Sequence, residues 1–112
     1  MKKQLALLLA LGLMLPLFNA HAVHNLESPQ TGSIKSGIGV VRGWLCDADE
    51  VAIRFDDMEM TTILYGNVRR DTESICDDRN NGFELLVNWS NLGPGQHRMR
   101  LYADGEEIDS ST

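Results

Sequence analysis

The chain has 112 residues, enough for one small domain, and its 10 Lys and Arg against 16 Asp and Glu give a net charge of −6 at pH 7. A strongly acidic surface repels phosphate backbones, so this charge balance disfavours a nucleic-acid-binding protein. It suits an exported protein that has to stay soluble.

The first 22 residues show the three parts of a cleavable bacterial secretion signal in their usual order: positive charge, an apolar stretch and small residues at a cleavage site. Lys2 and Lys3 give a short positive start, and the stretch from Leu5 to Phe18 is almost entirely apolar. This stretch holds 14 residues, whereas a membrane-spanning helix needs roughly 20 apolar residues. The pattern therefore favours a helical signal peptide over a membrane anchor.

Small residues mark the expected cleavage site. Ala20 and Ala22 fill both positions of an A-x-A site, so we expect the mature chain to begin at Val23. The sequence then divides into a signal peptide at 1–22 and one domain at 23–112, whose net charge without the two lysines is −8. We expect a periplasmic or secreted protein that meets a membrane only through the uncleaved signal peptide during export.

The mature chain opens with a polar, extended lead-in at 23–36, which has room for a short edge strand. Ile38 to Leu45 is rich in β-branched residues and predicts a central strand. From Val51 to Phe55, the apolar Val51, Ile53 and Phe55 fall on one face and Arg54 on the other, which predicts a half-buried strand. Asp56-Asp57 predicts a turn into a returning strand at Met58 to Leu64.

Strand patterns return after an irregular segment at 65–81. Phe83 to Val87 alternates, with Phe83, Leu85 and Val87 on one face, and it predicts a strand. His97 to Ala103 predicts another, with Met99 and Leu101 facing inward. Asp104-Gly105 is a hairpin signal, and the strand that would begin at 106 is expected to be incomplete. No helical period appears after residue 22, so we expect an all-β fold, an antiparallel sandwich of about six or seven short strands.

The mature chain holds two cysteines, Cys46 and Cys76. An even number in a small exported domain predicts one disulfide bond. Closing a loop of about 30 residues would stabilise the domain by roughly 3–4 kcal/mol.

Several short motifs between Leu26 and Gly105 occur together: GWLC, YGNVRRD, NGF, LGPGQH and ADG. In this order they resemble an immunoglobulin-like β-sandwich module of bacterial exported proteins. The resemblance implies a sandwich in which Trp44 and the Cys46–Cys76 pair form a plug in the core. It implies no particular activity, because such modules are attached to many different proteins.

One loop carries oxygen ligands suited to calcium, the only cofactor that the sequence suggests. It is not an EF-hand, because Arg79 and Asn88 stand where the third and twelfth ligands would be. A looser site, with Asp47 or Asp49 nearby, remains an alternative to plain turn chemistry. The candidate ligands are Asp77, Asp78, Asn80 and Asn81.

Aromatic residues are the other binding candidates. Trp89 lies in a predicted turn, where it would either stack on a sugar or cap the core, and Tyr65 is equally ambiguous. Catalytic signals are weak: no GxSxG occurs, the cysteines are assigned to a disulfide, and His97 is expected at a strand edge.

The sequence therefore favours a non-enzymatic, exported module for binding, adhesion or structural spacing at the bacterial cell envelope. Its partner would be a protein or glycan ligand, and nucleic acid is not expected. The alternatives are a calcium- or carbohydrate-binding module, or the N-terminal part of a larger secreted enzyme.

Overall fold

A computed structural model of the chain describes residues 23–112. The expected signal peptide, with Ala20 and Ala22 of its cleavage site, lies outside the described residues. Seven strands, one short helix and two 3₁₀ turns follow in chain order: β1 (His24–Ser28), β2 (Ile38–Leu45), β3 (Val51–Phe55), β4 (Thr61–Val68), η2 (Arg70–Thr72), α2 (Glu73–Cys76), β5 (Asn80–Asn88), η3 (Trp89–Leu92), β6 (Met99–Ala103) and β7 (Glu106–Ser111).

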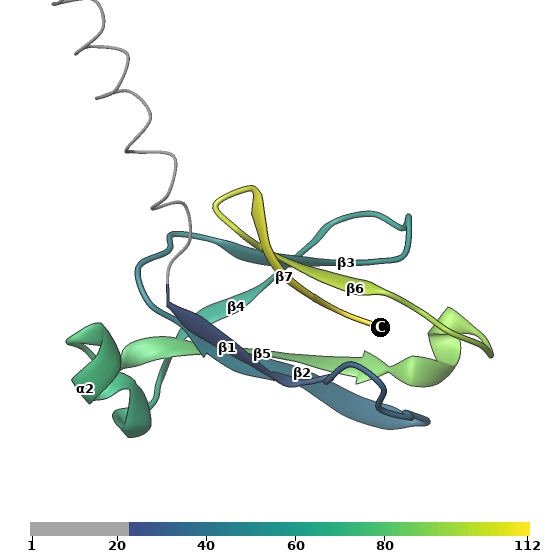
Figure 1. Ribbon diagram of the computed structural model, residues 1–112, viewed down its shortest axis with the longest axis horizontal. Coiled ribbons are helices and arrows are strands. Elements are labelled where there is room, and N and C mark those ends of the chain that lie inside the picture. The colour runs from purple at the N-terminus through teal and green to yellow at the C-terminus, as the bar shows by residue number, and fades with distance from the viewer. Residues whose placement is uncertain (1–22) are drawn as a thin grey trace, which may run out of the picture.

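All strands are antiparallel and form one continuous sheet in the order β1-β2-β5-β4-β3-β6-β7. Figure 1 shows the sheet folded into two layers, with β1, β2 and β5 in one and β3, β6 and β7 in the other. The all-β antiparallel expectation is confirmed. The division into two separate sheets, as in an immunoglobulin-like sandwich, is not, because β4 belongs to both layers.

Strand β4 changes partner along its length. Residues 61–63 pair with β3, whereas the part from Leu64 onward pairs with β5. The register with β5 shifts between Tyr65 and Asn67, and Gly66 between them has a φ of 104° that favours glycine. This bulge accompanies the bend of the sheet. The strand runs from Thr61 to Val68, whereas the sequence predicted Met58 to Leu64.

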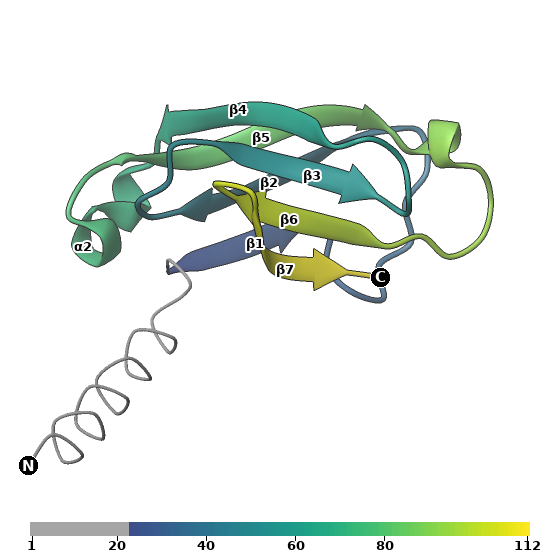
Figure 2. The ribbon, with the colours of Figure 1, turned by 90° about the horizontal axis from the view of Figure 1, so that it is seen from above.

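The two edge strands, β1 and β7, come close without forming a ladder (Figure 2). His24 Nε2 lies 3.1 Å from Asp109 Oδ2, and the N–H of Gly32 donates to the carbonyl oxygen of Thr112 at 2.8 Å. The sheet is therefore nearly closed. Strand β7 pairs with β6 across the Asp104-Gly105 turn through five residue pairs, so the last strand, which was expected to be incomplete, is present from Glu106 to Ser111.

Alternating side chains of every strand build the core between the layers. The fully buried members include Val41, Leu45, Ile53, Phe83 and Leu101. Their burial follows the period-two patterns of the sequence, since one face of each strand points inward.

The expected core plug at Trp44 is wrong. Trp44 is half-buried on the outer face of β2, because its neighbours Gly43 and Leu45 face inward. A Cβ at position 43 would lie 2.6 Å from Cζ of Phe83 and 2.3 Å from the carbonyl oxygen of Asn25. The absence of a side chain at Gly43 therefore lets the Phe83 ring, and not the indole of Trp44, fill this part of the core.

The predicted disulfide is present between Cys46 and Cys76, whose Cα atoms lie 5.2 Å apart. It joins the end of β2 to α2, and it indicates an oxidising, non-cytoplasmic setting. Arg69 fastens the same region, because its guanidinium donates to the carboxylates of both Glu27 and Asp71.

Within residues 23–112, no helix has the length and apolar character needed to cross a membrane.

Candidate functional site

Loops meet at two opposite ends of the folded sheet (Figure 1). At one end lie the β2–β3 loop, α2 and the β6–β7 hairpin. At the other lie the β1–β2 loop, the β3–β4 turn and η3. Each end holds a pocket of about 440 Å³.

The pocket at the disulfide end is acidic. We call it the acidic pocket; it is lined by Asp47, Ala48, Asp49, Tyr65, Asp78, Asn80, Asn81 and Asp104. The structure thus brings the β2–β3 loop next to the loop that carries the predicted calcium ligands. Asp77 is the one candidate ligand outside the pocket, because it ends α2 in a left-handed conformation with φ 66°.

Hydrogen bonds within the protein already use several of these groups. Oδ1 of Asp104 accepts from the N–H groups of Asp49 and Glu50, both at 2.9 Å. The buried amide of Asn81 donates to Oγ1 of Thr72 at 2.9 Å and to the carbonyl of residue 78 at 3.0 Å. Among the described residues, no three His, Cys, Asp or Glu side chains form a group that could hold a metal ion.

Tyr65 has a structural contact in the acidic pocket. Its hydroxyl donates to the carbonyl oxygen of Leu45 at 2.6 Å. Burial raises the pKa of the Tyr65 phenol, and neighbouring carboxylates, including that of Asp78, raise it further. Tyr65 therefore ties β4 to the end of β2 in its neutral form, and it lies at the opposite end of the sheet from Trp89.

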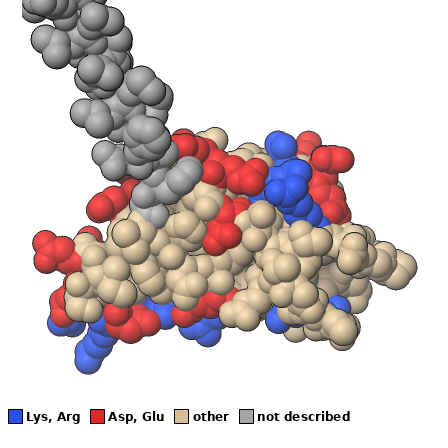
Figure 3. Space-filling model, viewed as in Figure 1, with Lys and Arg blue, Asp and Glu red and all other residues tan. Residues whose placement is uncertain are grey.

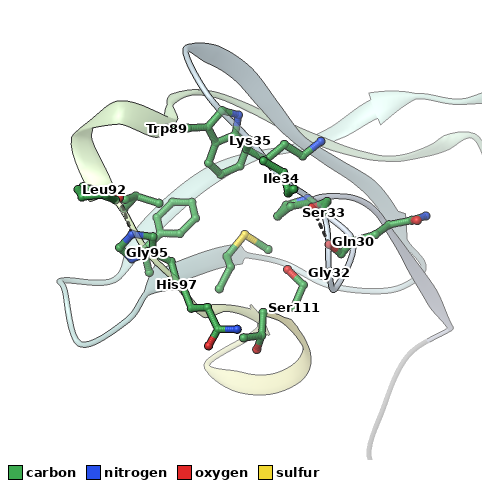
Figure 4. Close-up of a pocket in the computed structure, with 17 residues that line it drawn as sticks. Gln30, Gly32, Ser33, Ile34, Lys35, Trp89, Leu92, Gly95, His97 and Ser111 are labelled. Carbon is green, nitrogen blue, oxygen red and sulfur yellow. Dashed lines mark hydrogen bonds between the residues drawn. The ribbon is translucent and has the colours of Figure 1, made fainter.

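The second pocket lies at the other end, and we call it the end pocket (Figure 4). The lead-in loop forms one wall, with Gln30, Ser33 and Ile34, and the loop after η3 forms the other, with Gly95 and His97. The remaining lining residues are Pro29, Gly32, Lys35, Phe55, Trp89, Leu92, Gly93, Pro94, Gln96, Met99, Ser111 and Thr112.

Aromatic and sulfur-containing side chains make the inner part of the end pocket apolar. Trp89 is 8% exposed and meets Phe55 edge to face, with ring centroids 6.0 Å apart. Met99 beside them is 2% exposed. A Cβ at position 39 would lie 2.2 Å from Nε1 of Trp89, so Gly39 leaves the space that the indole occupies.

His97 holds one wall of the end pocket in place. Its Nδ1 lies 2.7 Å from Oδ2 of Asp56 on the β3–β4 turn, and its Nε2 lies 2.7 Å from the carbonyl oxygen of Gly93. Both partners are acceptors, so this arrangement favours the imidazolium form, in which both ring nitrogens donate. The hydrogen bond to Asp56 raises the pKa of His97, and the carbonyl of Gly93 raises it further.

Asp56 completes this contact. Its Oδ1 accepts from the N–H of Arg98 at 2.9 Å. This backbone hydrogen bond is the main cause that lowers the pKa of Asp56, and the hydrogen bond from His97 is the second. The ion pair therefore fastens the loop after η3 to the β3–β4 turn.

The linings of the two pockets differ in charge. Figure 3 shows acidic side chains over much of the upper and left parts of one face and few charges at its lower right. None of the 16 Asp and Glu side chains lines the end pocket, whereas Lys35, the only lysine among the described residues, lies on its rim.

Among the residues that line the end pocket, only Trp89 was predicted from the sequence as a ligand-binding candidate. Lys35 comes from the lead-in loop, Phe55 from β3, and Leu92 and His97 from η3 and the loop after it. The sequence gives no sign that these segments meet. The sequence held one sign of this pocket: the Gly-Pro-Gly run at 93–95 predicts a turn directly before Gln96 and His97.

Comparison with known proteins adds no relative: no family model, no curated protein and no solved structure matches this chain. The resemblance to immunoglobulin-like modules rests on the sequence motifs alone.

Proposed function

We propose that the protein is an exported, non-enzymatic binding module of the bacterial cell envelope, and that the end pocket is its ligand site. The single observation that carries this proposal is a pocket of about 440 Å³ with an apolar interior and a polar rim. Sites for small ligands have volumes of about 300–1,000 Å³ and the same division between apolar walls and a few polar groups.

The exposure of the rim also supports binding over a purely structural spacer. Ile34 is 97% exposed on the lead-in loop, next to the pocket opening. Leu92 is half-buried on the opposite wall. An apolar group entering the pocket would cover both side chains, which gives a hydrophobic gain on binding.

The chemistry of the available side chains supports a non-enzymatic role. Cys46 and Cys76 are joined to each other, so neither is a thiolate nucleophile. Both ring nitrogens of His97 lie 2.7 Å from oxygen atoms of the protein, Oδ2 of Asp56 and the carbonyl oxygen of Gly93, so both are already engaged in contacts within the fold.

The carbohydrate alternative is less well supported. Sugar binding by stacking needs an open aromatic face, but Trp89 is 8% exposed and its indole is held between Gly39 and Phe55. The calcium alternative depends on the acidic pocket, where Asp104 and Asn81 already serve hydrogen bonds within the protein. We therefore place the function at the opposite end.

A neutral apolar dye tests the site. N-phenylnaphthylamine should gain fluorescence with the wild-type protein, and Leu92→Asp should weaken its binding by at least about tenfold, because an unpaired carboxylate in an apolar pocket costs more than about 1.4 kcal/mol. Amide shifts in NMR spectra should cluster at 33–35 and 93–97.

The matched control is Leu86→Asp, the same substitution on the outer face of β5, where Leu86 is 73% exposed. It should leave dye binding unchanged. Equal binding by the wild type and Leu92→Asp, or loss of binding in Leu86→Asp alone, would refute the proposed site. Melting curves establish that both variants are folded.

A further inference from the structure

The composition of the end pocket wall differs from that of the whole domain. The described residues hold 16 acidic side chains against 8 Lys and Arg, yet no Asp or Glu lies among the 17 residues that line the pocket. A protein with net charge −8 repels anions over most of its surface. The lining itself adds no acidic side chain to that repulsion, and the carboxylate of Asp56 beside it contacts His97.

The cationic groups of the lining are Lys35 and His97. His97 lies 2.7 Å from the carboxylate of Asp56, which balances any positive charge on its ring, so Lys35 is the cation available to a ligand. Figure 4 shows Lys35 beside Trp89, at the top of the pocket. A single cation next to an apolar interior complements a molecule with an apolar body and one anionic group.

Polar groups on the rim fit the same kind of ligand. Gln30, Ser33 and Gln96 lie at the opening with Lys35, whereas Phe55 and Met99 lie deeper. Ser33 already donates to the carbonyl of Gln30 at 2.7 Å. The amide of Gln96 is a hydrogen-bond donor that an anionic group at the opening could use.

We propose that the ligand of the end pocket is a small amphiphilic anion, an aromatic or aliphatic carboxylate or sulfonate, whose apolar part lies against Phe55, Trp89 and Met99 and whose charge pairs with Lys35. This inference rests on the proposed function, since it names the chemical class of the ligand for that same site.

Two dyes with the same aromatic framework separate charge from apolar contact. Anilinonaphthalene sulfonate carries an anionic group, and N-phenylnaphthylamine does not. Lys35→Gln should weaken binding of the anionic dye by about two- to fivefold, the range for a solvent-exposed ion pair. The same substitution should leave the neutral dye within twofold. Lys35 is exposed, so the variant is expected to fold.

Salt provides a second measurement. Raising ionic strength screens an exposed ion pair, and it screens the repulsion by the net negative charge in both proteins, so salt should lower the affinity for the anionic dye more in the wild type than in Lys35→Gln. The matched control is Arg70→Gln, which removes one positive charge near the disulfide end, where Arg70 begins η2. It should leave binding of both dyes unchanged.

The outcomes separate the two proposals. If neither dye binds, or if Leu86→Asp abolishes binding of both, the proposed site itself is wrong. If both dyes bind in the pocket and Lys35→Gln weakens neither, the site stands and the anionic class of ligand is wrong. Equal weakening by Arg70→Gln and Lys35→Gln would show a general effect of net charge and would also overturn the pairing with Lys35.

Discussion

Reduction of the Cys46–Cys76 disulfide should destabilise the domain strongly. The bond closes a loop with a sequence separation of 30 residues, which contains β3, β4 and α2. For a loop of this length, the chain-entropy relation gives a loss of about 12 cal/mol/K, or about 4 kcal/mol at 25 °C. A small domain has a total stability of roughly 5–15 kcal/mol, so this loss is a large fraction of the whole.

Denaturation in guanidinium chloride measures the effect. With a slope of roughly 2 kcal/mol per molar, a loss of about 4 kcal/mol should lower the unfolding midpoint by about 2 M in reductant. The control is a double Cys46→Ala, Cys76→Ala variant, whose midpoint should be the same with and without reductant. Mass spectrometry establishes that the bond is reduced in the treated wild type.

Equal midpoints for the oxidised and the fully reduced wild type would refute this reasoning. Such a result would mean that the reduced unfolded chain is already as restricted as the cross-linked one, through residual structure between residues 46 and 76.

Three other outcomes follow from the structure. Gly39→Ala should destabilise the domain by about 1–3 kcal/mol in urea unfolding, because its Cβ would lie 2.2 Å from Nε1 of Trp89. Stability should be highest between the ordinary pKa values of Asp56, 3.8, and His97, 6.5. Because the pKa of His97 is raised on folding, its contribution to stability is lost as pH rises through its pKa in the folded protein. Because the pKa of Asp56 is lowered on folding, its contribution is lost as pH falls through its pKa in the folded protein. Melting temperatures should show this maximum, and His97→Gln should remove its alkaline side. Arg69→Gln should cost about 1–2 kcal/mol in the same unfolding assay, since it leaves two carboxylates without their donor.

Much of the strand pattern could be predicted because one face of each strand is buried. Met99 and Leu101 were expected to face inward and are 2% and 0% exposed. Phe83 was expected on the same face of its strand as Leu85 and Val87, and it is 1% exposed. Strict alternation of polar and apolar residues predicts a strand with one buried face.

The wrong expectations come from segments in which this contrast is weak. Strand β2 has apolar residues on both faces, and only the exposed Arg42 marks the face that it shares with Trp44 as the outer one. In β4, the exposed Leu64 and the bulge at Gly66 break the period, because the strand passes from one layer to the other.

The end pocket could not be predicted for a different reason. Its walls come from the lead-in loop, the loop after η3 and the last residues of β7. These segments meet only because the sheet folds back until β1 and β7 are close. Such proximity depends on the whole topology and leaves no local pattern at Lys35 or Leu92.

The position of β1 and β7 at opposite edges of one sheet also orders the events of folding. His24 and Asp109, which contact each other across the nearly closed edges, are separated by 85 residues along the chain. The two cysteines are separated by 30. A chain that emerges from its N-terminus can therefore form the disulfide while β6 and β7 are still to come. Closure of the sheet has to wait for the last strand, and until then the edge of β1 stays open to pairing with strands of other molecules.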